Sequence, residues 1–82
     1  MTYAKFRKKP VVVEAEQYLP AEGQVPFGLV RVDNEAGDVE EHICPTIEGP
    51  LSVTPGDWII RGVRGELYPC KPEIFAETYV PA

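Results

Sequence analysis

The sequence Pro55-Gly56-Asp57 constrains the fold of this chain more than any other stretch. Proline presets φ at the first corner of a β-turn, and glycine accepts the positive φ that a type II turn needs at the second corner. The Asp57 side chain can then hydrogen-bond the turn backbone. Residues 52–54 before the motif and residues 58–60 after it favour extended structure. The motif therefore predicts a strand, a tight turn and a second strand.

A second turn follows at residues 62–65, where a glycine at each end suits a short hairpin loop. Residues 66–68 would return as the next strand, with Leu67 facing the core. Because proline cannot donate a backbone hydrogen bond, we expect Pro69 and Pro72 to end the strand pairing.

Pro72 is also well placed to open a short helix, where its fixed φ fits and its missing N–H costs little. Glu73 beside it suits the positive end of a helix. Phe75 and Tyr79 are four residues apart and would share one helical face. Pro81 would end the helix.

Three further strands are expected earlier in the chain, at residues 10–19, 27–32 and 39–44. Side chains alternate between the two faces of a strand. In the first of these strands, Tyr18 would then lie at the rim of the more polar face. The better core face of that strand consists of Val11, Val13, Ala15 and Gln17.

The size of the chain, 82 residues, predicts a single domain over residues 1–82. Nine prolines and seven glycines favour many turns and no long helix. The expected fold is mainly β: a small antiparallel domain of five or six strands, curled or barrel-like, with a short C-terminal helix. The alternative is an α+β sandwich in which that helix covers one sheet face. Because so small a core gains stability from association, we also hypothesise a homo-oligomer.

Charge is unevenly distributed along the chain. Residues 1–9 form a basic N-terminal arm with four of the eight basic residues and no acidic one, whereas the rest carries a net charge of −9. An acidic body argues against broad nucleic-acid binding, since phosphate contacts need clustered Lys and Arg. No apolar run approaches the roughly 18 residues of a transmembrane helix, and no apolar segment follows the arm as in a secretory signal. We therefore expect a cytoplasmic protein without membrane attachment.

Glu14 and Glu16 share one strand face, and two carboxylates at this spacing could serve acid–base or metal chemistry. Alternating glutamates are also typical of the solvent side of a strand. The second interpretation is favoured because nothing else in the sequence completes a catalytic site. The acidic residues between positions 33 and 48 do not follow EF-hand spacing, so a solvated loop is expected there.

His42, Cys44 and Cys70 are the soft metal ligands of the chain. They lack the Cys-x₂-Cys pairs that mark zinc sites, and no signature supports a Cys–His nucleophile. We expect two reduced cysteines, a His42 on the surface of its strand, and no cofactor.

The remaining constellation is aromatic and basic. Arginine and lysine bind phosphates, and aromatic rings stack on bases, so a hairpin that gathers such residues could hold a nucleotide or an acidic peptide. The favoured alternative is a buried Trp58 with solvated arginines, because Trp58 and Arg61 point to opposite faces of their strand. The candidate binding residues are Trp58, Arg61, Arg64, Tyr68 and Lys71.

Three segments carry a resemblance to a known family: KKPVVVEA at residues 8–15, TIEG at 46–49, and PGDWIIRGVRGELYPCKPEIFAETY at 55–79. Together they resemble a widespread family of small phage and prophage proteins, most of them uncharacterised. The last segment, within the motif-bearing region 46–79, is long and specific. The resemblance implies a bacteriophage context and a bacterial host cell, and it assigns no catalytic residue.

Three functional hypotheses follow. The first is a non-enzymatic phage accessory protein that acts as a small protein-binding module toward a host or defence factor. The second is a small-ligand, nucleotide-type binding protein, and the third is a small metal- or Cys-dependent enzyme. The first is preferred because the chain is small and acidic and has no P-loop, dinucleotide-binding motif or catalytic triad signature.

Overall fold

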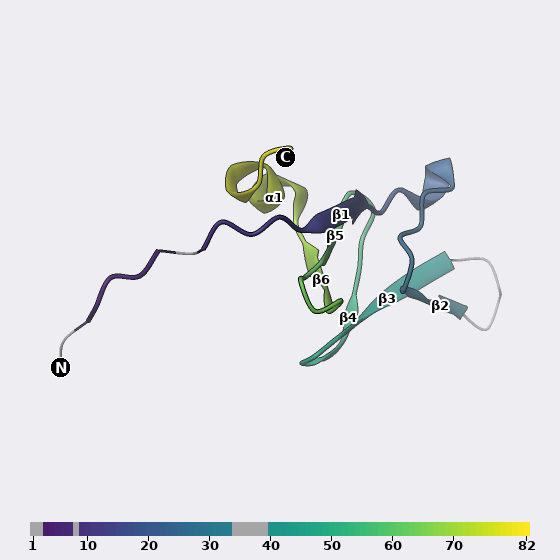
Figure 1. Cartoon of the computed structure of the whole chain (residues 1–82). Helices are drawn as coiled ribbons and strands as arrows, with labels where there is room; N and C mark the ends of the chain where they lie inside the picture. Colours follow the sequence, from purple (N-terminus) through teal and green to yellow (C-terminus); the bar gives the residue numbers. More distant parts are fainter. Residues whose placement is uncertain (1–2, 8, 34–39) are drawn as a thin grey trace.

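The computed structural model of this chain describes residues 3–7, 9–33 and 40–82 (Figure 1). Within these residues, six strands form two three-stranded antiparallel sheets that do not close into a barrel. The mainly β fold with a short C-terminal helix is thus confirmed. The elements are β1 (Glu14–Gln17), the 3-10 helix η1 (Pro20–Glu22), β2 (Val30–Asp33), β3 (Glu40–Thr46), β4 (Gly49–Ser52), β5 (Trp58–Arg61), β6 (Leu67–Cys70) and α1 (Pro72–Thr78).

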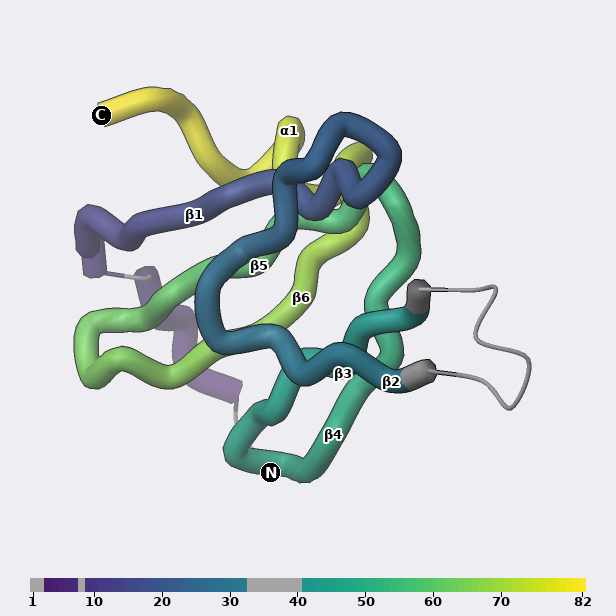
Figure 2. The backbone as a smooth tube through the Cα atoms, turned by 90° about the vertical axis from the view of Figure 1, so that its right-hand side faces the viewer, coloured from purple at the N-terminus to yellow at the C-terminus, as the bar shows by residue number. Residues whose placement is uncertain are grey.

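The first sheet has the strand order β1-β5-β6, and the second has the order β2-β3-β4. The chain leaves the first sheet after β1, builds the whole second sheet, and returns to the first sheet with β5. Figure 2 and Figure 1 place α1 and the second sheet on opposite sides of the first sheet, and β3 packs against β6. The first sheet is therefore the middle layer.

Both predicted turns are confirmed. The Asp57 N–H donates to the Thr54 carbonyl at 3.0 Å, Gly56 has φ of 96°, and the Thr54 N–H donates to Oδ2 of Asp57 at 2.9 Å. In the next hairpin, the Gly62 N–H donates to the Glu66 carbonyl at 2.8 Å. These two turns fix the order β5, β6 and α1 that the C-terminal sequence predicts.

Pro69 corrects one expectation, because it lies inside β6 opposite Ile59 and does not end the pairing. Hydrogen-bonded and non-hydrogen-bonded pairs alternate along antiparallel strands. Since Gly62 and Glu66 form a hydrogen-bonded pair, Pro69 falls in a non-hydrogen-bonded pair. Its missing N–H therefore costs no bond to β5, and Pro72 alone ends the strand and opens α1 as predicted.

Several strand bounds also differ from prediction. The expected strand 10–19 is paired only over β1, and residues 10–13 belong to no strand. β2 begins at Val30 because a turn at Phe27 and Gly28 interrupts the expected strand 27–32, and Gly28 adopts φ of 101°. The strand before Pro55 ends at Ser52, not Thr54. Val39 of the expected strand 39–44 lies outside the described residues.

The core between the two sheets consists of Tyr18, Cys44, Val53 and Ile59, with Leu29 and Leu67 packed against it. Leu67 thus faces the core as predicted. The expected core face of residues 11–17 is wrong: Val11 is 49% exposed, whereas Tyr18 is 2% exposed. Glu14, Glu16 and Tyr18 lie on the side of the chain that faces the second sheet. The second sheet covers Tyr18, whereas Glu14 and Glu16 lie beyond it and stay exposed.

The molecule is elongated, with extents of 54 × 31 × 23 Å and a Cα radius of gyration of 15.2 Å. A compact domain of this length would have a radius of gyration of about 12 Å. The difference arises because the chain before β1 runs away from the body in extended conformation (Figure 1). In the described ranges, no helix is long and apolar enough to cross a membrane.

Candidate functional site

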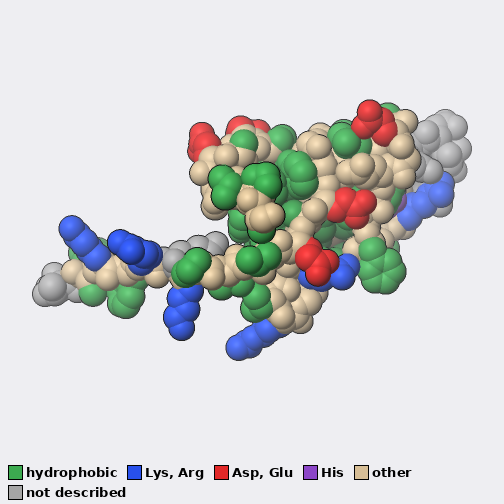
Figure 3. Space-filling model, turned by 45° about the horizontal axis from the view of Figure 1, so that its top comes forward, with side chains coloured by type: hydrophobic (Ala, Val, Ile, Leu, Met, Phe, Trp, Pro, Cys, Tyr) green, Lys and Arg blue, Asp and Glu red, His purple; other side chains and the backbone are tan. Residues whose placement is uncertain are grey.

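An apolar groove of about 500 Å³ lies between α1 and the extended residues that precede β1. Its walls are residues 10–13 on one side and residues 80–82 on the other, and its floor is aromatic. We call this surface the aromatic groove. Figure 3 shows apolar side chains gathered between the helix and the extended chain. The aromatic residues that line it are Trp58 of β5, Phe75 of α1 and Tyr79.

Three rings stack to form the floor of the aromatic groove. The rings of Trp58 and Phe75 are nearly parallel, with centroids 4.2 Å apart and an interplanar angle of 5°. Phe75 and Tyr79 are one helical turn apart, so their rings also stack, at 5.1 Å. Trp58 points to this side because strand parity sends it toward α1. Trp58 is half-buried and does not belong to the fully buried core. The expectation of a buried Trp58 is therefore corrected.

Tyr68 extends the aromatic surface on the same face of the first sheet. Its partner across β5 is Ile60, and Trp58 lies two residues away on that strand. A side-chain hydrogen bond with Tyr79 is the main cause that raises the pKa of Tyr68 to about 12, and burial adds to it. Two of the five candidate binding residues, Trp58 and Tyr68, therefore do lie on one surface.

Arg61 lies on the opposite face of the first sheet. Its guanidinium carbon is 5.9 Å from the centroid of the Phe27 ring, a cation–π distance. The two residues line a second, smaller pocket of about 290 Å³ together with Glu14 and Glu16. Both glutamates are exposed, as predicted, and they place carboxylates beside the one arginine of this pocket. That pairing disfavours an anionic ligand here.

The other two cations of the candidate set lie apart from the aromatic groove. Lys71 Nζ is 3.1 Å from Oδ1 of Asp57 and 3.1 Å from Oγ1 of Thr54, so it holds the start of α1 against the Pro55 turn. Arg64 is exposed at the tip of the hairpin. The candidate residues Arg61, Arg64 and Lys71 thus form no phosphate-binding cluster with Trp58.

His42 and Cys44 are both buried, which corrects the expectation of a surface histidine. The Tyr18 hydroxyl and His42 Nδ1 are hydrogen-bonded at 2.7 Å. Burial raises the pKa of the Cys44 thiol, and burial together with the nearby Asp57 and Glu73 raises that of Cys70. A raised pKa lowers the thiolate fraction on which nucleophilic and metal-binding cysteine depends. Among the residues that the structure describes, no three His, Cys, Asp or Glu side chains could hold a metal ion.

The sequence signalled part of the aromatic groove but not the whole of it. The spacing of Phe75 and Tyr79 predicts their common face, whereas the alternation of residues 10–19 predicts a core strand that includes residues 10–13. Nothing in the sequence connects those residues with the C-terminal helix, because their contact depends on the position of β1 beside β5. Comparisons with protein-family models, curated proteins and solved structures give no match to this chain.

Proposed function

We propose that this chain is a non-enzymatic bacteriophage or prophage protein that binds a protein partner through the aromatic groove in the cytoplasm of a bacterial host. The observation that carries the proposal is the open stack of Trp58, Phe75 and Tyr79. Large aromatic side chains dominate the energetics of protein interfaces. A domain with so few buried apolar residues would gain by burying these rings in its own core, yet it leaves them lining a surface groove.

The chemistry of the aromatic groove favours a partner segment that is apolar, because every residue that lines the groove is apolar or aromatic. The exposed charges near it in the chain have both signs: Lys9 precedes the wall formed by residues 10–13, and Glu73 and Glu77 lie on α1. Charge therefore does not select the partner here, and an extended peptide with aliphatic side chains fits this surface best.

The nucleotide-binding hypothesis has less support. It requires cations beside an aromatic face, but Arg61 lies across the sheet from Trp58 and Lys71 is paired with Asp57. The bacteriophage context rests on the resemblance of residues 55–79 and of the shorter segments described above.

The test is affinity capture of partners from a bacterial host lysate with the wild type, followed by titration calorimetry with the captured protein and its minimal peptide. The groove variant is Phe75→Gln/Val80→Gln. The matched control is Ile47→Gln/Leu51→Gln, which changes two exposed apolar side chains, one in the turn between β3 and β4 and one in β4. Circular dichroism melting verifies that both variants are folded.

We expect the captured segment to be apolar, and the groove variant to bind it at least about tenfold more weakly, which is roughly 1.4 kcal/mol. The control variant should bind like the wild type. Equal binding by the groove variant, or capture of no protein at all, would overturn the proposal.

A further inference from the structure

β1 is an edge strand of the first sheet, because it pairs with β5 on one side only. Residues 10–13 continue its direction as extended chain outside both sheets (Figure 1). An exposed edge presents unpaired N–H and C=O groups to any strand that can align with it. The valines of this stretch are β-branched and favour strands, so the edge is suited to receive a further strand.

Hydrogen bonds at the end of β1 show which of its backbone groups face outward. The Tyr18 N–H donates to the Asp57 carbonyl at 2.7 Å, and the Gly56 N–H donates to the Tyr18 carbonyl at 2.8 Å. In an antiparallel pair, the backbone groups of successive residues point alternately toward the partner strand and away from it. The Gln17 carbonyl accordingly faces outward, where it accepts a hydrogen bond from the Gln24 side chain at 2.7 Å. Even-numbered residues of this stretch therefore bond toward β5, and odd-numbered residues face the free edge.

Three odd-numbered residues, Val11, Val13 and Ala15, present backbone groups at the free edge. In the described part of the chain, Val11 and Val13 take part in no hydrogen bond. The alternation along β1 leaves the N–H and C=O of Ala15 unpaired as well. Residues 80–82 form the other wall of the aromatic groove, and among the described backbone hydrogen bonds none joins them to this edge.

The same three residues line the aromatic groove. Gln17 lies opposite Trp58, so the side chains of the odd-numbered residues share the Trp58 face of the first sheet. Their side chains thus face the groove while their backbone groups face the free edge. A strand added to this edge would place every second side chain on the groove side of the sheet. Edge and groove are therefore two parts of one binding surface.

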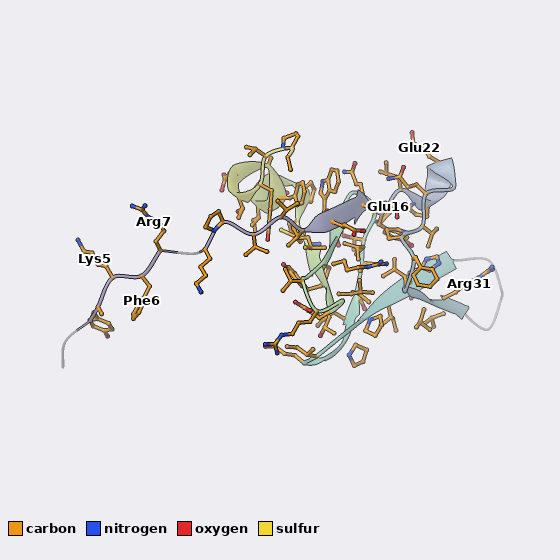
Figure 4. All side chains as sticks on the ribbon, viewed as in Figure 1. Lys5, Phe6, Arg7, Glu16, Glu22 and Arg31 are labelled. Carbon is orange, nitrogen blue, oxygen red and sulfur yellow. The ribbon has the colours of Figure 1, made fainter. Side chains whose placement is uncertain are left out.

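The free edge has a limit at each end. Pro10 has no N–H to donate, and the Gln17 carbonyl is already occupied by the Gln24 side chain. Figure 4 shows η1, with Glu22, past one end of β1, and Arg7 on the arm past the other end. The edge between these limits accommodates a strand of about six residues, which is a common strand length.

We propose that the partner of the aromatic groove binds as an extended strand added to the free edge of β1, hydrogen-bonded to the backbone of Val11, Val13 and Ala15. This inference rests on the proposed function and specifies how the groove holds its partner. The first sheet then has four strands, in the order partner-β1-β5-β6. Main-chain hydrogen bonds supply affinity, and the groove selects the side chains. The fitting sequence alternates aliphatic residues, which face the groove, with polar residues, which lie beside the exposed Glu14 and Glu16.

The test uses the full chain and an end-capped synthetic peptide in which valine and threonine alternate. The edge variant is Val13→Pro, which removes an N–H that faces the free edge. The matched control is Val12→Pro, which removes the same chemical group one residue away, where it faces away from that edge. Both valines line the groove, and neither N–H has a partner in the described structure, so strand addition is what distinguishes the two variants. Circular dichroism verifies that both variants are folded.

We expect the amide protons of Val13 and Ala15 to exchange with solvent at least about tenfold more slowly when the peptide saturates the protein, because they then donate main-chain hydrogen bonds. Nuclear magnetic resonance measures the exchange of each amide. The amides of Glu14 and Glu16 already bond to β5 and should change less. The Val13→Pro variant should bind the peptide at least about tenfold more weakly than Val12→Pro does.

Unchanged exchange at Val13 and Ala15, equal binding by the two proline variants, or no binding of the peptide at millimolar concentration would overturn strand addition. Slow exchange of the same two amides in the free protein would also overturn it, since a second copy of the chain would then cover the edge. Failure of the groove itself is a separate result, given by equal binding of the captured partner to the wild type and to Phe75→Gln/Val80→Gln.

Discussion

The hydroxyl of Tyr18 and Nδ1 of His42 are 2.7 Å apart in the core between the two sheets. Tyr18 follows β1 of the first sheet, and His42 lies within β3 of the second. Their rings also meet edge-on, with centroids 5.3 Å apart. Because Tyr18 is 2% and His42 is 7% exposed, water does not substitute for either partner. This pair is a polar connection between the sheets inside an otherwise apolar core.

Replacement of Tyr18 by Phe should lower the free energy of unfolding by about 1–3 kcal/mol, because it leaves a buried imidazole nitrogen without its hydroxyl partner. Urea unfolding followed by circular dichroism measures the change. Tyr3→Phe is the matched control, since Tyr3 is 90% exposed. The structural role of the pair would be refuted by a Tyr18→Phe variant as stable as Tyr3→Phe.

Replacement of Lys71 by Met should lower the free energy of unfolding by about 1–2 kcal/mol, because it removes the cation that faces the buried Asp57 carboxylate. The loss is smaller than for a fully buried pair because the Lys71 side chain is 54% exposed and its charge is screened by water. Lys9→Met, on the exposed arm, is the control and should change stability little. Equal stabilities of the two variants in urea would contradict this assignment.

Stability should depend on pH in the alkaline range through Tyr68. Its pKa is raised from 10.0 to about 12 in the folded chain, so folding favours the neutral phenol. This contribution is complete below pH 10 and is lost as the pH rises toward 12. Tyr79→Phe removes the main cause of the shift, so the pKa of Tyr68 should fall toward its ordinary value. Ultraviolet titration of tyrosinate in wild type and variant measures it; an unchanged high-pH transition in Tyr79→Phe would exclude the hydrogen bond as its cause.

The two cysteines should differ in reactivity. Cys44 is fully buried and Cys70 is half-buried, and the pKa of each thiol is raised. A thiol-specific chromogenic reagent should therefore modify one thiol per native chain, slowly, and both thiols after unfolding in urea. The Cys70→Ser variant should show no reactive thiol until it is unfolded. Rapid modification of native Cys70→Ser would mean that Cys44 is accessible after all.

Local signals explain the part of the fold that could be predicted. Gly56 and Pro55 specify one turn, the paired glycines at 62 and 65 specify the next, and Pro72 opens the helix. Each of these features depends on the dihedral preferences of the residue itself, so sequence alone suffices. The order β5, β6 and α1 follows from them.

What could not be predicted depends on the relation between distant segments. The covered side of residues 10–18 is decided by where the second sheet stops, which leaves Glu14 exposed and Tyr18 buried. The partners of His42 and Lys71 lie 24 and 14 positions away in the chain, so neither contact leaves a local pattern. The aromatic groove combines a strand, a helix and an extended segment. The sequence predicts the common face of Phe75 and Tyr79 on the helix, but it does not predict that residues 10–13 lie beside that face.

Trp58 is the single tryptophan of the chain, and it forms part of the floor of the aromatic groove. The indole emission of this protein thus originates from one ring, whose centroid is 4.2 Å from the centroid of the Phe75 ring. Any molecule that covers the ring displaces water from it and changes the colour and intensity of that emission. The second sheet, by contrast, contributes no indole signal. The protein therefore carries its own optical reporter of groove occupancy, which needs no attached dye and distinguishes ligands that cover the ring from those that bind elsewhere.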